Sequence, residues 1–211
     1  MRGASPNTRI RATFFDLGGV LVEVRFDRFV AALARETGIA AAELPGRLEA
    51  LRPDSQLLDS GAIDGGEFHR RLIRHLQVDL EWSRFHEIYT DIFSLNEAVA
   101  GLAQRLRPVT RLSIISNTDP LHYGYIVARY PVFSIFEQPV TSFSARALKP
   151  DPGIFQYALQ RLEVAPPEAL FIDDLAANTA AAQAMGMHAI HFEDAGQLQE
   201  QLAWYFPRLL D

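Results

Sequence analysis

Four short stretches of this chain carry side chains that can do chemistry at the end of an apolar run or in a loop. They are FFDLGG (14–19), IISN (114–117), LKPD (148–151) and FIDD (171–174). Together they supply carboxylates, a hydroxyl, an amide and one ammonium. The ammonium is notable because Lys149 is the single lysine among the 20 lysine and arginine residues.

The acids of this set suit a phosphoryl group and a divalent cation. A carboxylate such as Asp16 is the type of nucleophile that forms an aspartyl-phosphate. Gly18 and Gly19 lack a Cβ, so backbone groups there can approach a ligand closely. The adjacent acids Asp173 and Asp174 repel each other unless a cation or protons intervene. Oxygen ligands from Asp16, a backbone carbonyl and Asp174 would suit Mg²⁺.

The remaining polar groups suit the phosphoryl oxygens, where charge spreads in the transition state. Ser116, Asn117 and Lys149 could neutralise that charge. Each also has a structural interpretation: Ser116 or Asn117 could cap a helix that begins near Pro120, and Lys149 could be a solvated loop cation. Likewise, Asp16 could be a turn residue and Asp174 a helix cap. The combination of all four stretches favours a functional site.

The elements that position these residues alternate between strands and helices. Apolar runs rich in β-branched and aromatic residues predict strands over 11–15, 111–116, 169–173 and 188–192. Apolar residues at helical spacing predict helices around 99–106 and 155–162, the latter beginning at Pro152 behind Asp151. This alternation predicts an α/β fold, a Rossmann-like doubly wound parallel sheet. In such sheets ligands bind outside the carboxyl ends of the strands, where three of the four stretches lie.

The segment between the first and second predicted strands interrupts this alternation, and its sequence predicts helices. Apolar stripes around Phe29, Phe68 and Phe85 predict three or four helices of about ten residues each. We therefore expect a small all-helical cap domain over 23–94, inserted into a catalytic core formed by 1–22 and 95–211.

Composition excludes several classes of function. The chain has 211 residues and no cysteine, which excludes disulfides, thiolate catalysis and cysteine-ligated zinc. Its formal net charge of −6 gives no indication of a nucleic-acid or anionic-membrane partner. No window approaches the length of a membrane span, and the apolar run near the start is too short for a signal peptide. We expect a cytoplasmic protein.

The four stretches, in this order and at this spacing, resemble the four motifs of the haloacid dehalogenase-like hydrolase superfamily. The resemblance covers about 11–192. The branch of bacterial α-D-glucose-1-phosphate phosphatases is the one most similar to four segments of this chain: FDLGGVL, SNTD, LKPDPGIF and IDDLAANTAAAQAMGM. The resemblance implies Asp16 as nucleophile and Mg²⁺ held by Asp16, the Gly18 carbonyl and Asp174.

The resemblance also assigns the phosphate-binding groups. It implies that Gly19, Ser116, Asn117 and Lys149 bind the phosphate, with Lys149 counted among the catalytic residues. Asp173 and Asn178 would lie beside the metal ligands without binding the metal.

Gly18 departs from the pattern. Most phosphatases of this superfamily carry there a second aspartate, which protonates the leaving group and then helps water attack the intermediate. Losing a general acid/base typically costs about 10²–10⁴-fold in rate. His122 and Glu23 are the candidates to replace it, and Arg25 and Arg28 are candidates to face the substrate from the cap, although a solvated surface position is the alternative for each.

Three activities fit the absence of that aspartate. Haloacid dehalogenases need no proton for halide, but they use no metal and lack the paired acids. Phosphonoacetaldehyde hydrolases need a cap lysine, and 23–94 contains none. We therefore expect a Mg²⁺-dependent phosphatase acting on a small phosphorylated metabolite with an easily expelled leaving group, such as a sugar phosphate. The alternatives are a phosphate-ligand binding or regulatory protein without turnover, and a 2-haloacid dehalogenase; the oligomeric state is left open.

Overall fold

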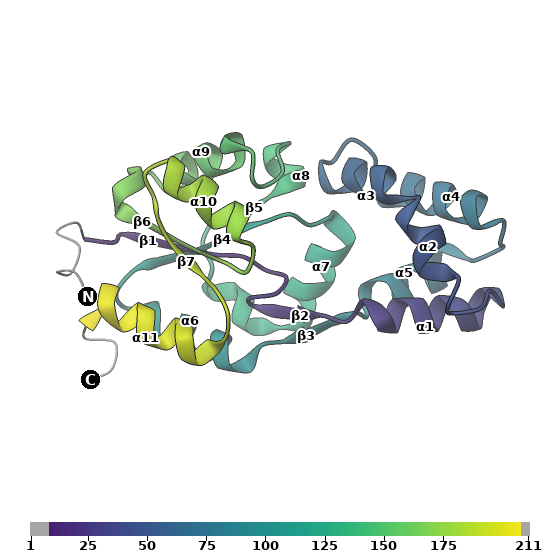
Figure 1. The fold of residues 1–211 in the computed structure, drawn as a ribbon, viewed down its shortest axis with the longest axis horizontal. Coiled ribbons are helices and arrows are strands. Elements are labelled where there is room, and N and C mark those ends of the chain that lie inside the picture. The colour runs from purple at the N-terminus through teal and green to yellow at the C-terminus, as the bar shows by residue number, and fades with distance from the viewer. Residues whose placement is uncertain (1–8, 208–211) are drawn as a thin grey trace.

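The computed structural model describes residues 9–207 and contains a five-stranded parallel sheet (Figure 1). The strand order is β5-β4-β1-β6-β7, so β1 lies at the centre. The strands are β1 (Ala12–Phe15), β4 (Arg111–Ser116), β5 (Val140–Thr141), β6 (Ala169–Asp173) and β7 (His188–His191). This sheet confirms the predicted Rossmann-like α/β fold. The edge strand β5 was not predicted.

Helices cover both faces of the sheet, with α9 and α10 on one side and α6 and α11 on the other in Figure 1. The helices of this part are α6 (Glu97–Leu106), α7 (Pro120–Arg129), α8 (Ser142–Ala145), α9 (Pro152–Arg161), α10 (Ala176–Ala184) and α11 (Ala195–Tyr205). Neighbouring side chains of β1 point to opposite faces, since Phe14 and Phe15 belong to two separate apolar clusters. Both faces of the central strand are therefore buried.

The segment between β1 and β4 is helical, as expected, but it holds more helices than predicted. They are α1 (Phe26–Thr37), α2 (Leu44–Glu49), α3 (Arg52–Asp59), α4 (Gly65–Leu76) and α5 (Trp82–Thr90). The prediction of three or four was wrong because it assumed about ten residues for each helix, whereas α2 has 6 and α3 has 8. Each of these two short helices begins with a proline in its first turn.

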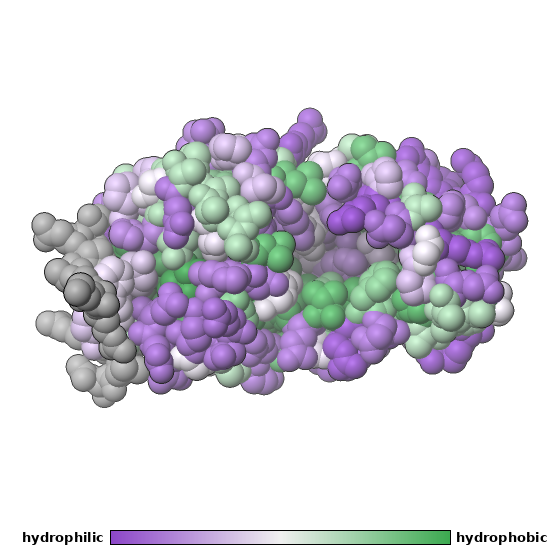
Figure 2. All heavy atoms as spheres, viewed as in Figure 1, coloured by the Kyte–Doolittle hydropathy of each residue, from purple (hydrophilic) through white to green (hydrophobic). Residues whose placement is uncertain are grey.

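A two-stranded antiparallel ribbon joins the five helices to the sheet. It consists of β2 (Val22–Val24) and β3 (Phe93–Leu95), with Glu23 opposite Ser94. We propose that the helical cap, 23–94, meets the core, 1–22 and 95–211, within this ribbon. Figure 2 shows that the molecular surface is hollowed between the two parts. Within 9–207, no helix is both long and apolar enough to cross a membrane.

Candidate functional site

The centre of the site is built by two adjacent strands and one loop. β1 and β6 pair in parallel, and the backbone N–H of Asp16 donates to the carbonyl of Ile172 at 2.8 Å. The carboxyl ends of these strands therefore bring Asp16 beside Asp173 and Asp174. Lys149 enters from the loop before α9, and its Nζ lies 2.7 Å from Asp16 Oδ1 and 2.7 Å from Asp173 Oδ2.

Asp173 is fully buried, and its oxygens are occupied by donors from this chain. Oδ1 accepts from the Leu175 N–H at 2.8 Å and from Asn178 Nδ2 at 2.9 Å. Oδ2 accepts from Lys149 Nζ and from Asn178 Nδ2, the latter at 3.1 Å. Asp173 thus fixes the position of the lysine and has no lone pair clearly available for a metal.

Asp16 and Asp174 have carboxylate oxygens to spare. Asp16 Oδ1 accepts from the Leu17 N–H at 2.6 Å as well as from Lys149. Over 9–207, neither Asp16 Oδ2 nor the Asp174 carboxylate accepts a hydrogen bond from another residue. One oxygen each from Asp16, Asp173 and Asp174 lie within 4.8 Å of one another, which is a spacing that one cation can span.

Burial, with a smaller contribution from a neighbouring acid, raises the pKa of two of these carboxyls. Burial raises the pKa of Asp16 to about 6, with Lys149 opposing the shift and Asp173 adding to it. Burial, followed by the charge of Asp173, also raises the pKa of Asp174. A single ammonium therefore does not fully compensate three acids, and a divalent cation between Asp16 and Asp174 would complete the neutralisation.

The glycine turn after β1 brings backbone to the same place. Gly19 has φ of 82°, a left-handed conformation, and a Cβ on it would overlap Oδ2 of Asp174 and lie 2.7 Å from its Cγ. Only glycine fits there. The Gly19 N–H donates to the Val22 carbonyl at 2.8 Å, while the Gly18 carbonyl accepts no hydrogen bond within the described chain. That carbonyl is the free backbone oxygen that the predicted metal site requires.

Asn117 is bound to the backbone of the lysine. Its Oδ1 accepts from the Lys149 N–H at 2.7 Å, and its Nδ2 donates to the Lys149 carbonyl at 2.9 Å. The amide thereby positions the lysine loop against the end of β4. Ser116 is buried at that strand end, and its hydroxyl lies 3.5 Å from the Asn117 carbonyl. Direct contact of Ser116 or Asn117 with phosphate stays a prediction.

A cavity of about 410 Å³ opens over these groups. It is lined by Asp16, Gly18, Gly19, Val24, Asn117, Lys149, Asp174, Leu175 and Asn178. Most of the predicted site residues thus share one cavity, and Ser116 is the one that does not line it. Two apolar side chains that line the cavity, Val24 and Leu175, were not predicted from the sequence. They are 48% and 56% exposed. The sequence offered a signal for Leu175, because it is a large apolar residue directly after the acid pair Asp173-Asp174.

His122, a candidate replacement acid, has another role in the structure. Its Nδ1 lies 2.6 Å from Asp119 Oδ2, and its Nε2 lies 2.9 Å from the Tyr89 carbonyl. Both ring nitrogens of His122 are therefore engaged within the protein. The Tyr89 hydroxyl also donates to Asp119, at 3.1 Å. This network ties cap helix α5 to core helix α7 and leaves the imidazole no free nitrogen for a substrate.

The other cap candidates do not line the cavity. Glu23 lies exposed on β2, and Arg25 forms an exposed ion pair with Asp27 at 3.2 Å. Arg28 lines a separate groove between α1 and α5. Among the residues that line the cavity of about 410 Å³, Lys149 is the only cation.

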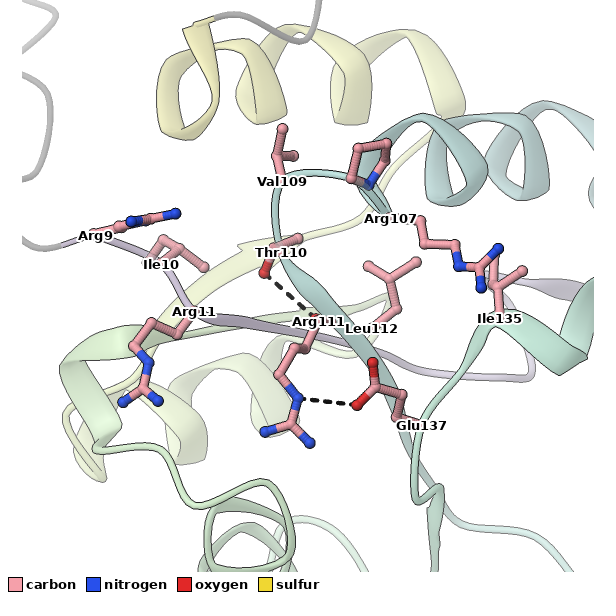
Figure 3. Close-up of a pocket in the computed structure, with 11 residues that line it drawn as sticks. Arg9, Ile10, Arg11, Arg107, Val109, Thr110, Arg111, Leu112, Ile135 and Glu137 are labelled. Atoms are coloured by element: carbon pink, nitrogen blue, oxygen red, sulfur yellow. Dashed lines mark hydrogen bonds and ion pairs between the residues drawn. The ribbon is translucent and has the colours of Figure 1, made fainter.

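A second cavity, of about 440 Å³, lies at the opposite end of the sheet, where β1 and β4 begin (Figure 3). Arginines line it, and Arg111 pairs with Glu137 at 2.9 Å. In Figure 3 the guanidinium groups of Arg9, Arg11 and Arg107 point in different directions. None of the predicted site residues is present, and amino ends of parallel strands are not where such sheets bind ligands. We therefore assign the site to the cavity at the carboxyl ends.

A parallel α/β sheet with an aspartate after the central strand, an acid pair after its neighbour and a buried lysine between them defines a hydrolase with a Rossmann-like core. The family model for haloacid dehalogenase-like hydrolases matches residues 10–186, and the chain belongs to this family. The particular resemblance to α-D-glucose-1-phosphate phosphatases stays a prediction.

Two of the relatives that this chain matches over most of its length are named as phosphatases. The chain is 24% identical to the D-ribitol-5-phosphate phosphatase of Bacteroides thetaiotaomicron over 92% of this chain and 97% of the relative. It is 24% identical to a phosphoglycolate phosphatase of Pseudomonas putida over 88% of this chain and 70% of the relative. A structure of a haloacid dehalogenase family enzyme of Bacteroides thetaiotaomicron, in complex with magnesium and inorganic phosphate, covers 90% of this chain and 98% of its own, with a TM-score of 0.79 and 22% identity. This structural likeness supports the fold.

Proposed function

We propose that this protein is a Mg²⁺-dependent phosphatase that hydrolyses a small phosphate monoester through an aspartyl-phosphate on Asp16. The observation that carries the proposal is the position of Lys149, whose Nζ bridges Asp16 and Asp173 beside the unpaired Asp174. The two relatives named as phosphatases, and the magnesium and phosphate complex of a haloacid dehalogenase family enzyme, support it.

The donor set fits Mg²⁺. Asp16 Oδ2, the Gly18 carbonyl and Asp174 would hold it, since these oxygens share one cavity and accept no hydrogen bond from another residue within 9–207. When bound, the cation would neutralise charge on the phosphoryl oxygens. Lys149 would supply the second positive charge and orient Asp16, while Asn117 and Asp173 hold the lysine in place. The Gly19 turn would present backbone to the ligand.

Gly18 motivates the competing proposal of a phosphate-ligand binding protein without turnover. The position two residues after Asp16 has no side chain, and His122 has no free nitrogen to offer. Tight Mg²⁺-dependent binding of a sugar phosphate, with no phosphate released over hours, would favour this alternative. Dehalogenation is disfavoured because it gives no role to Asp174.

Hydrolysis of p-nitrophenyl phosphate with and without EDTA tests the proposal. We expect turnover that is abolished by chelation and by Asp16→Asn, which keeps the shape of the side chain and removes its charge. Metal-independent activity on 2-chloropropionate would replace the proposal with dehalogenation.

A further inference from the structure

Two exposed apolar side chains line the same cavity as Asp16. Val24 ends strand β2, and Leu175 is the N-cap residue of α10. Within 9–207, Leu175 is the most exposed of the large hydrophobic residues. Figure 2 shows hydrophobic surface beside the hollow between the two parts of the molecule. Apolar side chains that gather in one cavity, instead of being scattered singly, are typical of a ligand-binding groove.

Val24 lies against the glycine turn that follows β1. A Cβ on Gly18 would lie 3.2 Å from Val24 Cγ2, so the valine methyl group packs over this glycine. The turn is fixed to β2, because the Gly19 N–H donates to the Val22 carbonyl at 2.8 Å. Hydrocarbon therefore borders the turn whose Gly18 carbonyl is proposed to bind Mg²⁺.

Leu175 is held beside the acid pair by its backbone. Its N–H donates to Asp173 Oδ1 at 2.8 Å, and its carbonyl accepts from the N–H groups of Asn178 and Thr179 at 3.0 and 3.2 Å. These bonds fix the backbone of the residue, while the side chain stays exposed in the cavity. The leucine side chain therefore directly follows Asp174, a proposed metal ligand.

The polar side chains of the cavity are already engaged or are assigned to the metal and the phosphoryl group. Lys149 Nζ lies between two carboxylates, the Asn117 amide bonds to the Lys149 backbone, and Asn178 Nδ2 donates to Asp173 at 2.9 Å. The acids of the lining are the proposed nucleophile and metal ligands. The two apolar side chains are left to contact the rest of a substrate, and hydrocarbon placed on them would displace water from apolar surface.

We propose that Val24 and Leu175 contact the leaving group and select esters that carry hydrocarbon in the first carbons beyond the ester oxygen. The inference rests on the proposed phosphatase function and adds a substrate class: monoesters with an alkyl or aryl leaving group rather than a polyhydroxylated one. The hydrophobic contribution is roughly proportional to the apolar area removed from water, so affinity should rise with each methylene group that reaches the two side chains.

Phosphonates, which the enzyme cannot hydrolyse as esters, measure this selection without turnover. Methylphosphonate, propylphosphonate and 2,3-dihydroxypropylphosphonate share one head group, and the last two have the same three-carbon chain. In calorimetric titrations with Mg²⁺, we expect the wild-type Kd to fall by about two- to fourfold for each methylene between methylphosphonate and propylphosphonate. The Kd of the dihydroxylated ligand should exceed that of propylphosphonate by at least about fivefold.

Matched variants assign the effect to the two side chains. Val24→Thr and Leu175→Asn keep the approximate size of each side chain and replace hydrocarbon by polar atoms. Each should reduce the Kd ratio of the two three-carbon ligands severalfold, while the Kd of methylphosphonate stays within about twofold of wild type because the head-group site is unchanged. Val127→Thr makes the same change on an exposed valine of α7 that does not line the cavity, and it should keep the wild-type ratio.

The outcomes separate this inference from the proposed function. Equal wild-type Kd values for methylphosphonate and propylphosphonate, or an unchanged ratio in both cavity variants, would overturn the inference. Hydrolysis of p-nitrophenyl phosphate by the wild type would in that case leave the phosphatase proposal standing. Absence of that hydrolysis, together with absence of Mg²⁺-dependent binding of any of the phosphonates, would overturn both.

Discussion

Replacing Gly19 by alanine probes the closest approach between backbone and acid in the site. The residue has φ of 82°, and a Cβ there would overlap Asp174 Oδ2 and lie 2.7 Å from Cγ and 3.1 Å from Oδ1. A left-handed conformation costs an alanine about 1–2 kcal/mol relative to glycine. In a chain of this size, that cost lowers the melting temperature by about 2–8 °C.

The larger effect of Gly19→Ala should fall on the metal. The methyl group can be accommodated only if the Asp174 carboxylate rotates away from Asp16, which separates the two acids proposed to bind Mg²⁺. Disturbing the support of a metal ligand typically costs about 10–100-fold in metal affinity. We therefore expect the Mg²⁺ concentration for half-maximal phosphatase activity to rise by at least about tenfold.

Gly18→Ala is the matched control for this substitution. Gly18 does not have a positive φ, and a Cβ there would lie 3.2 Å from Cγ2 of Val24, an exposed side chain that can move. The assay is a Mg²⁺ titration of p-nitrophenyl phosphate hydrolysis together with thermal unfolding of both variants. If Gly19→Ala kept the wild-type Mg²⁺ dependence while Gly18→Ala lost it, the proposed role of Gly19 would be refuted. That role is to leave room for the Asp174 carboxylate beside Asp16.

Three other substitutions test separate parts of the structure. Gly18→Asp restores a side chain at the vacant acid/base position, and if that acid is truly lacking the rate should rise by about 10²-fold or more; an unchanged rate would indicate a substitute proton donor. His122→Ala leaves the buried Asp119 carboxylate without its ion-pair partner and should destabilise the fold by about 3–5 kcal/mol, measured by urea unfolding, whereas Arg52→Ala, which breaks an exposed ion pair, should leave stability unchanged. Asp59→Asn tests the raised pKa: a carboxyl whose pKa rises from 3.8 to about 6 on folding stabilises the protein below pH 4, and this contribution is lost as the pH rises through 6. The variant should therefore gain stability relative to wild type between pH 4 and pH 7, and a parallel pH profile for the two proteins would argue against the raised pKa.

The main strands could be predicted because burial on both faces demands continuous apolar runs. The runs at 111–116 and 169–173 coincide with β4 and β6 residue by residue. β5 has only two residues, too few for any periodicity to show. The ribbon between β2 and β3 pairs residues about seventy positions apart, and nothing local in either segment specifies its partner.

The composition of the site could be predicted from where each strand ends. Parallel strands share one carboxyl edge, so Asp16, Asp173 and Asp174 were expected to lie close together. How the side chains bond depends on loop conformation instead. The Asn117 amide was expected at a phosphate, yet in the structure both of its ends bind the backbone of Lys149.

Rapid acid quench during turnover, followed by peptide mass spectrometry, tests the central claim most directly. Because Gly18 offers no base to activate water against the intermediate, a phosphoryl group should accumulate on the peptide that contains Asp16. The same peptide of Asp16→Asn should carry no phosphoryl group. Sustained phosphate release by Asp16→Asn, or a phosphoryl group found on another residue, would contradict the account.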